Sequence, residues 1–196
     1  MNLGMAFFLA VFGIAMAAYW FLGQRGRGPT LRDIPAFYRM RGAVELAVED
    51  GSRIHISIGS NDITSPQSAI ALVGLSLVRQ IATVASDSDL PPVTTVGNGM
   101  LTILAQDTLR ATYTTMGLGS DFENTIARIT GLTPFAFAAG VTSVLLDEET
   151  SANIISGTFH DELALITTTA NRAQILTLGG TDTLSGQAVA YARADY

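Results

Sequence analysis

The sequence contains no cysteine and no lysine. The lack of cysteine excludes disulfides, thiolate nucleophiles, zinc knuckles and cysteine-ligated iron–sulfur clusters. The lack of lysine excludes Schiff-base chemistry, a lysine general base and the P-loop of nucleotide hydrolases. Charged residues are scarce as well, at 14% of the 196 residues, whereas 48% are hydrophobic. This composition is typical of a globular protein attached to a membrane and not of a disordered chain.

One hydrophobic run is long enough to cross a bilayer. Residues 3–22 contain no charge, and a helix of this length covers about 30 Å, the thickness of the hydrocarbon core. Tyr19 and Trp20 lie near its end, where aromatic rings favour the headgroup level. Residues 15–17 also form a small-x-small signal cleavage site, but no basic residue precedes the run and it exceeds the usual roughly 7–15 residues. We therefore predict a transmembrane anchor over residues 1–23.

Arginines follow this run closely and none precedes it. Arg25, Arg27 and Arg32, together with Trp20, form the predicted membrane-surface set, and Arg39 and Arg41 come soon after. By the positive-inside rule, the remainder of the chain lies in the cytoplasm. Basic side chains beside a bilayer also attract anionic headgroups, so the lipid bilayer is a predicted partner. Residues 24–34, rich in glycine, form a juxtamembrane linker.

The rest of the chain is acidic. Residues 54–196 carry five arginines against thirteen acidic residues, a net charge of −8, and the whole chain has a net charge of −6. Such a surface lacks the basic footprint that phosphate backbones require. We therefore predict no nucleic-acid partner.

A helix followed by a repeated strand–turn–helix pattern organises residues 35–196. Pro35 suits the first turn of a helix that ends at Gly51, in the position of a left-handed C-cap. Five β-rich runs follow, each succeeded by glycine with small polar residues and then by a helix-like segment. These runs cover residues 53–58, 92–96, 124–129, 152–155 and 174–178.

Strands that alternate with helices at this spacing require crossover connections. The sequence therefore predicts an α/β fold: one Rossmann-like domain over residues 35–196, with a doubly wound, mostly parallel five-stranded sheet and helices on both faces. The apolar segments 69–84 and 135–146 contain polar interruptions or are too short to span a membrane, so we place them in the core or in a subunit interface.

The turns that follow the strands supply the candidate ligand site. In a parallel sheet they gather at the carboxyl edge, where helix N-termini favour an anion such as phosphate or carboxylate. The candidates are Gly59, Asn61, Asp62, Gly97, Asn98, Gly99 and His160. The structural interpretation is equally complete, because glycine permits sharp turns and Ser or Thr caps helices without any ligand. Ser65–Pro66 and Thr133–Pro134 are predicted caps of this kind, and Thr158 with Asp161 resembles a capping box.

No catalytic, cofactor or metal site is predicted. The Gly97-Asn98-Gly99 turn resembles a dinucleotide fingerprint, but its third small residue and the following acidic residue are missing. His160 precedes two carboxylates, yet adjacent residues on a helix point in different directions and do not converge on a metal. His55 and Ser57 share one strand face about 6–7 Å apart, too far for direct proton transfer, which favours a hydrogen-bonded structural role for His55.

Two weak patterns favour self-association. The segment 100–116 carries five threonines, which are poor helix formers on an exposed surface. The apolar run has small residues at Ala6 and Ala10 and at Gly13 and Ala17, spaced for close helix contact. We therefore expect a homo-oligomer or a larger membrane protein complex.

Several segments resemble an uncharacterised family of bacterial membrane-anchored proteins, a domain of unknown function. The segments that carry the resemblance are residues 32–37, 45–51, 53–59, 71–76, 89–97 and 106–110. The resemblance implies an N-terminal transmembrane helix in a bacterial membrane, and it brings no catalytic residues with it. It also implies relatives that continue beyond position 196 with further membrane segments.

Together these patterns predict a single-pass protein of the bacterial cytoplasmic (inner) membrane whose cytoplasmic domain is a structural or assembly component. The alternative is a domain that binds a small ligand or a nucleotide at the glycine-rich carboxyl edge through Asp62, Asn98 and His160. An enzyme that acts at this edge belongs to the same alternative. A scaffold buries its apolar helix faces against protein, whereas a binding domain keeps an open pocket at the strand ends.

Overall fold

The computed structural model describes residues 3–24, 32–60, 62–64, 68–86 and 88–196. Arg25, Arg27, Asn61 and the predicted cap at residues 65–66 therefore lie outside the described residues. The chain separates into two compact units, Met1–Ile34 and Pro35–Tyr196.

In its described residues the first unit contains one helix, α1 (Leu3–Gln24), which has no charged residue. Its side chains are exposed almost throughout, and none of its most apolar window is buried inside the structure. The helix is long and apolar enough to be a membrane span or a signal sequence. The helix Ser68–Ala85 passes the same length and composition test, but 39% of its window is buried in the second unit.

The second unit alternates helices and strands. Its elements are α2 (Pro35–Glu49), β1 (Arg53–Ser57), α3 (Ser68–Ala85), β2 (Val93–Val96), α4 (Gly99–Thr115), a 3₁₀ turn (Asn124–Ile126), β3 (Ala127–Ile129), α5 (Pro134–Asp147), β4 (Thr150–Gly157), α6 (Leu163–Arg172), β5 (Leu176–Thr181) and α7 (Leu184–Arg193).

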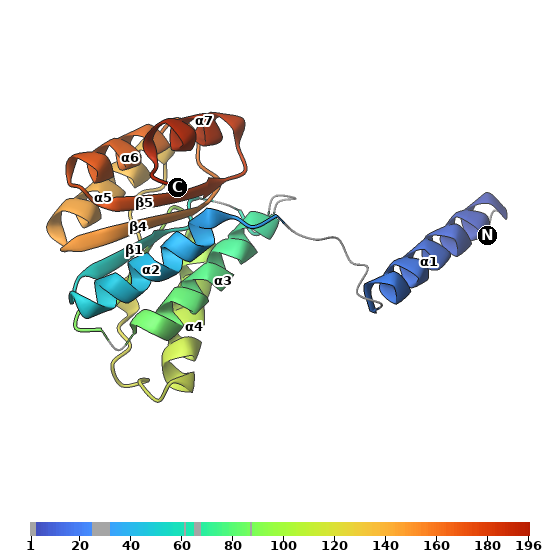
Figure 1. Cartoon of the computed structure of the whole chain (residues 1–196), viewed down its shortest axis with the longest axis horizontal. Helices are drawn as coiled ribbons and strands as arrows, with labels where there is room; N and C mark the ends of the chain where they lie inside the picture. Colours follow the sequence, from blue (N-terminus) through green and yellow to red (C-terminus); the bar gives the residue numbers. More distant parts are fainter. Residues whose placement is uncertain (1–2, 25–31, 61, 65–67, 87) are drawn as a thin grey trace. The chain divides into compact units, whose positions relative to one another are not determined.

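The five strands form one parallel sheet in the order β3-β2-β1-β4-β5. Figure 1 shows α2, α3 and α4 on one face of this sheet and α5, α6 and α7 on the other. This is the doubly wound α/β architecture predicted from the alternation of strands and helices. The direction of winding reverses between β1 and β4, which makes their carboxyl ends the topological switch point.

The two faces of the sheet differ in polarity. Along β1, Ile54 and Ile56 enter the apolar core beneath α2, α3 and α4. The alternate residues His55 and Ser57 face α5, as the period of two along a strand requires. Thr95 of β2 and Asn153 of β4 are in register with them and are also buried. One side of the sheet is therefore mainly apolar, with the buried Thr94 among its strand residues, whereas the other encloses a polar cluster.

The last residues of the chain cover the outer edge of β5. The Gly179 N–H donates to the Tyr196 carbonyl at 2.8 Å, and the Asp195 N–H donates to the Thr177 carbonyl at 2.9 Å. The Arg39 guanidinium of α2 lies 5.2 Å from the centre of the Tyr196 ring. These contacts protect an edge strand that would otherwise present unpaired backbone groups.

Three local expectations need correction. Gly179 and Gly180, expected in a turn, continue β5 and pair with Ile155 and Ser156 of β4. The expected strand 124–129 begins with a 3₁₀ turn and is a strand only from Ala127. The capping box of Thr158 with Asp161 does not form, because α6 begins later, at Leu163.

Two glycines allow the carboxyl ends of β1 and β4 to approach each other closely. A Cβ on Gly157 would lie 2.4 Å from the Ile58 carbonyl oxygen, and a Cβ on Gly59 would lie 2.9 Å from the Thr158 carbonyl oxygen. Gly59 also has a φ of +72°, a conformation that other residues rarely adopt. The two strand ends can approach this closely only because neither glycine has a side chain.

Gly157→Ala is therefore expected to destabilise the protein by about 1–3 kcal/mol, the usual cost of overpacking a close contact. Chemical denaturation of the full chain in detergent, followed by circular dichroism, measures this. Gly99→Ala is the matched control, because a Cβ there meets nothing within 4 Å and should change stability by no more than about 0.5 kcal/mol. Equal effects of the two substitutions would contradict the packing argument.

Candidate functional site

The structure brings three of the predicted turns together at the carboxyl edge. The Gly97 N–H, after β2, donates to the Gly59 carbonyl, after β1, at 2.9 Å. Gly59 in turn lies against Thr158, which follows β4. The turns after β1, β2 and β4 are therefore neighbours, as the parallel sheet predicts.

The polar candidates in these turns bind the chain's own backbone. The Asp62 carboxylate accepts the Thr64 N–H at 2.9 Å and the Thr64 hydroxyl at 2.8 Å, and these hydrogen bonds hold the pKa of Asp62 below its usual value. Asn98 caps α4, because its Oδ1 accepts the N–H groups of Met100 at 2.9 Å and Leu101 at 3.2 Å. Both arrangements are those expected for residues that stabilise a turn or a helix start.

His160 has an exposed side chain, and its N–H donates to the Glu162 carboxylate at 3.0 Å. Gly97 is needed for packing, since a Cβ there would lie 2.7 Å from the Ser60 Cβ, whereas Gly99 has open space around it. The described candidates thus share one edge. The side chains of Asp62 and Asn98 have structural partners, whereas the hydrogen bond of His160 involves its backbone N–H. Their proposed ligand-binding role stays a prediction.

The described residues at the switch point pack closely together. Doubly wound domains usually bind ligands between the carboxyl ends of the strands at which the winding reverses. In this chain Gly157 lies against the backbone of Ile58 at that position. The Phe159 ring is fully buried there, next to Gly59 and at 6.2 Å from the centre of the Phe137 ring.

A cavity of about 520 Å³ lies at the opposite, amino edge of the sheet, among residues that come just before β1, β2, β3 and β4. Its charged lining residues are Arg53, Asp89, Asp121, Glu123, Arg128, Asp147, Glu148 and Glu149. The candidate residues chosen from the sequence all lie in turns that follow strands, so they do not include the residues of this cavity. The signal available was the acidic character of several turns that precede strands.

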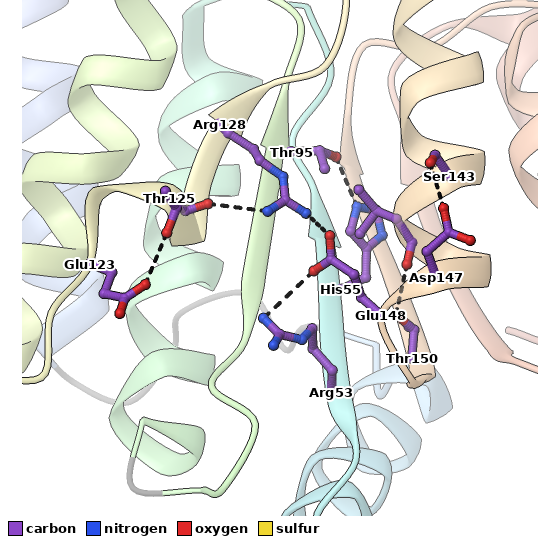
Figure 2. A network of polar contacts seen from close by, with 11 residues as sticks. Arg53, His55, Thr95, Glu123, Thr125, Arg128, Ser143, Asp147, Glu148 and Thr150 are labelled. Carbon is purple, nitrogen blue, oxygen red and sulfur yellow. Dashed lines mark hydrogen bonds and ion pairs between the residues drawn. The ribbon is translucent and has the colours of Figure 1, made fainter.

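Glu148 joins the two arginines of this cavity. Its carboxylate accepts a hydrogen bond from the Arg128 guanidinium, and Arg53 Nη1 lies 3.7 Å from its other oxygen. Figure 2 shows Glu148 between the two arginines, with His55 and Thr95 behind them. Both guanidinium groups thus share one carboxylate, and the Nε of Arg53 is buried without a hydrogen-bond partner. Within the described part of the chain, no group of three or more His, Asp or Glu side chains is placed to hold a metal ion.

His55 is tied at both ring nitrogens. Nδ1 lies 2.8 Å from Asn153 Oδ1, Nε2 lies 2.8 Å from Thr95 Oγ1, and Thr95 Oγ1 lies 3.4 Å from Ser57 Oγ. Burial lowers the pKa of His55 to about 4; the hydrogen bond to Asn153 opposes this shift and the charge of Arg128 adds to it. At neutral pH the ring is therefore uncharged, and each of its two nitrogens already has a hydrogen-bond partner within the protein. This confirms the expectation of a hydrogen-bonded structural residue.

The stability of the protein should fall on acidification because of His55. Between pH 6.5 and about 4, His55 is protonated in the unfolded chain but remains neutral in the folded protein. The free energy of unfolding should therefore drop by about 3 kcal/mol as the pH falls through this window. Denaturation curves of the full chain between pH 7 and pH 4 measure the effect.

His55→Gln removes the titrating ring and is expected to flatten this part of the pH profile relative to the wild type. His160→Gln is the control, since the side chain of the second histidine is exposed, and should leave the slope as it is. A wild-type slope that persists in His55→Gln would contradict the assignment.

Glu148→Gln should destabilise the protein by about 1 kcal/mol, because it leaves two partly buried arginines without their shared counter-charge. Glu149→Gln makes the same charge change in the same cavity, and in the described part of the chain Glu149 forms no ion pair. Its effect on the unfolding free energy should be close to zero. The ion-pair interpretation is wrong if Glu149→Gln is the more damaging of the two.

Comparison with known proteins shows the family of the chain but no function. No curated protein and no solved structure matches the sequence. A domain of unknown function, DUF6754, matches residues 2–196, which is nearly the whole sequence. The parallel α/β domain with its preceding apolar helix thus belongs to the DUF6754 family.

Proposed function

We propose that this protein is a single-pass component of a bacterial cytoplasmic membrane, with α1 as the anchor and the α/β domain in the cytoplasm as a structural or assembly unit. It acts as a homo-oligomer or as part of a larger membrane complex. The observation that carries the proposal is the closely packed switch point: the place where a doubly wound domain normally holds a ligand is used for packing Gly157 and Phe159.

The apolar helix and its flanking residues support the membrane anchor. α1 has no charge over its length, and Tyr19 and Trp20 are exposed near its end. Basic residues follow the helix in the sequence and none precedes it, which favours a cytoplasmic domain. The bilayer is therefore the first partner of the protein.

An apolar groove between α2 and α3 supports a protein partner. A cavity of about 630 Å³ lies there, and its apolar lining residues are Phe37, Met40, Val44, Ile81 and Val84. Tyr38, Arg41, Glu45 and Gln80 complete the lining. The side chains of Phe37 and Val84 are more than half exposed. Exposed apolar surface of this kind is typical of interaction sites.

The alternative function is small-ligand binding at the carboxyl edge. The observation that favours it is the meeting of the turns after β1, β2 and β4, which brings the regions of Asp62, Asn98 and His160 to one edge. A ligand there would have to bind outside this closely packed region, on the surface of these turns.

Native mass spectrometry of the full chain, extracted from its own membrane in detergent, tests both candidates. A defined oligomer or hetero-complex without a retained small molecule is expected, and the intact mass should include residues 1–17. A monomer that carries a nucleotide-sized or phosphate-sized mass would overturn the scaffold proposal. Loss of that mass in Asp62→Ala with His160→Ala would then assign the ligand to the carboxyl edge.

Recovery of a chain shortened after Ala17 in the soluble fraction would show that α1 is a signal sequence. That result would overturn the proposed anchor, whatever the oligomeric state.

A further inference from the structure

The most exposed apolar side chains of the domain include a group at one corner of the sheet. Met100 and Ile103 lie in the first turns of α4, Ile129 ends β3, Leu132 lies in the following turn, and Phe135 is the second residue of α5. All five are exposed, Leu132 at 80% and Ile103 at 66%. We call this group the apolar corner.

The apolar corner is continuous across the carboxyl edge of the sheet. Ile129 pairs with Val96 of β2, and the Thr130 N–H donates to the Val96 carbonyl at 3.2 Å. A Cβ on Gly97 would touch Phe137 of α5 at 3.3 Å. The starts of α4 and α5, on opposite faces of the sheet, therefore meet around the ends of β2 and β3.

No charged residue occurs in the segments that build this corner. Residues 91–106 and 129–146 contain no Asp, Glu or Arg. The opposite end of the same elements is strongly acidic: Asp89, Asp121, Glu123, Asp147 and Glu149 lie around the amino-edge cavity. The domain thus has a charge-free apolar corner around the ends of β2 and β3 and an acidic cavity at the amino edge. The turns after β1, β4 and β5, elsewhere on the carboxyl edge, also carry acids: Asp62, Asp161 and Asp182.

The helix dipoles do not account for the acidic ends of α2 and α5. Acidic residues stabilise the first turn of a helix and destabilise the last, yet Glu49 and Asp147 are the last residues of these two helices. Helices α6 and α7 follow the opposite, favourable pattern, with Arg172 and Arg193 in their last turns.

The chain enters the domain at the same edge as the apolar corner. A short connection joins the end of α2 to the start of β1, so α2 runs antiparallel to the strands. Its 15 residues span about 22 Å, more than the length of β1. Pro35 therefore lies at the carboxyl edge, with Ile34, Phe37 and Tyr38 exposed beside it and Arg32 and Arg39 adjacent in sequence. Exposed aromatic and arginine residues of this kind favour the membrane interface.

We propose that the apolar corner docks on the bilayer surface and that Leu132 and its neighbours insert at the level of the headgroups and upper acyl chains. The proposal rests on the membrane anchor proposed above. Ten residues separate α1 from α2, a reach of at most about 35 Å, which keeps the carboxyl edge close to the bilayer. The acidic amino edge then faces away from anionic lipid, where its repulsion is smallest.

The absence of cysteine from the sequence permits a direct test with single spin labels. Leu132→Cys reports the apolar corner, Ser120→Cys reports an exposed position beside the amino edge, and Met16→Cys reports α1. The full chain is reconstituted in phosphatidylcholine vesicles that contain phosphatidylglycerol. Power-saturation EPR then compares the accessibility of each label to oxygen, which enters the bilayer, and to a nickel chelate, which stays in water.

We expect nickel accessibility at Leu132 to be severalfold lower than at Ser120, with high oxygen accessibility. Ile103→Ser combined with Phe135→Ser should raise nickel accessibility at the Leu132 label toward the Ser120 value. Leu146→Ser is the control, because Leu146 is 61% exposed at the other end of α5, and it should leave the label unchanged.

Three outcomes overturn the proposal and can be told apart. A Leu132 label as accessible to nickel as Ser120, with Met16 in the bilayer, removes the docking and leaves the anchor intact. A Met16 label in water removes both the anchor and the docking. A Leu132 label protected from both oxygen and nickel shows that protein, not lipid, covers the corner.

Discussion

The close approach of β1 and β4 at their carboxyl ends is the contact on which the rest of the domain depends. The sheet reverses its winding there, and Gly157 packs against the Ile58 backbone without room for a side chain. The same approach buries Phe159 between the strand ends and α5. A doubly wound fold can leave this place open for a ligand or close it for stability. In this chain the described residues pack closely there, and Asp62 and Asn98 accept hydrogen bonds from N–H groups of their own turns.

The architecture was predictable from the sequence because its signals are local. Alternation of Ile54, His55 and Ile56 gives the strand period, and Gly51, at φ +65°, ends α2 as the C-cap pattern indicates. The errors fall where distant residues decide. Gly179 and Gly180 are strand residues because β4 and Tyr196 supply their backbone partners. The start of α6 is similarly set by the hydrogen bond between Glu162 and the His160 N–H, which no spacing rule indicates.

The candidate site was predictable only in part, for the same reason. Parallel topology correctly places the turns after β1, β2 and β4 together, but it does not show which polar groups the chain itself consumes. Asp62 and Asn98 both bind local N–H groups. The ion pairs of Glu148 with Arg53 and Arg128 join residues that are far apart in sequence, each of which reads alone as a solvated charge. The two hydrogen-bond partners of His55, Asn153 and Thr95, are 98 and 40 residues away in the sequence.

The two edges of the sheet therefore differ in chemistry as well as in direction. All crossover helices begin at the carboxyl edge of the sheet and end at the amino edge. If helix starts and helix ends differ in residue type, the surfaces at the two edges therefore differ as well. In α2 and α5 the bias places a carboxylate, Glu49 or Asp147, at the helix end, which costs roughly 0.3–1 kcal/mol per charge at the helix dipole. Helices α6 and α7 lack this bias, because Arg172 and Arg193 lie in their last turns. At the amino edge Glu148 binds two arginines, whereas Leu132 and Phe135 are exposed at the carboxyl edge. The contrast between the two edges therefore rests on the turns around β1 to β4 and not on α6 and α7.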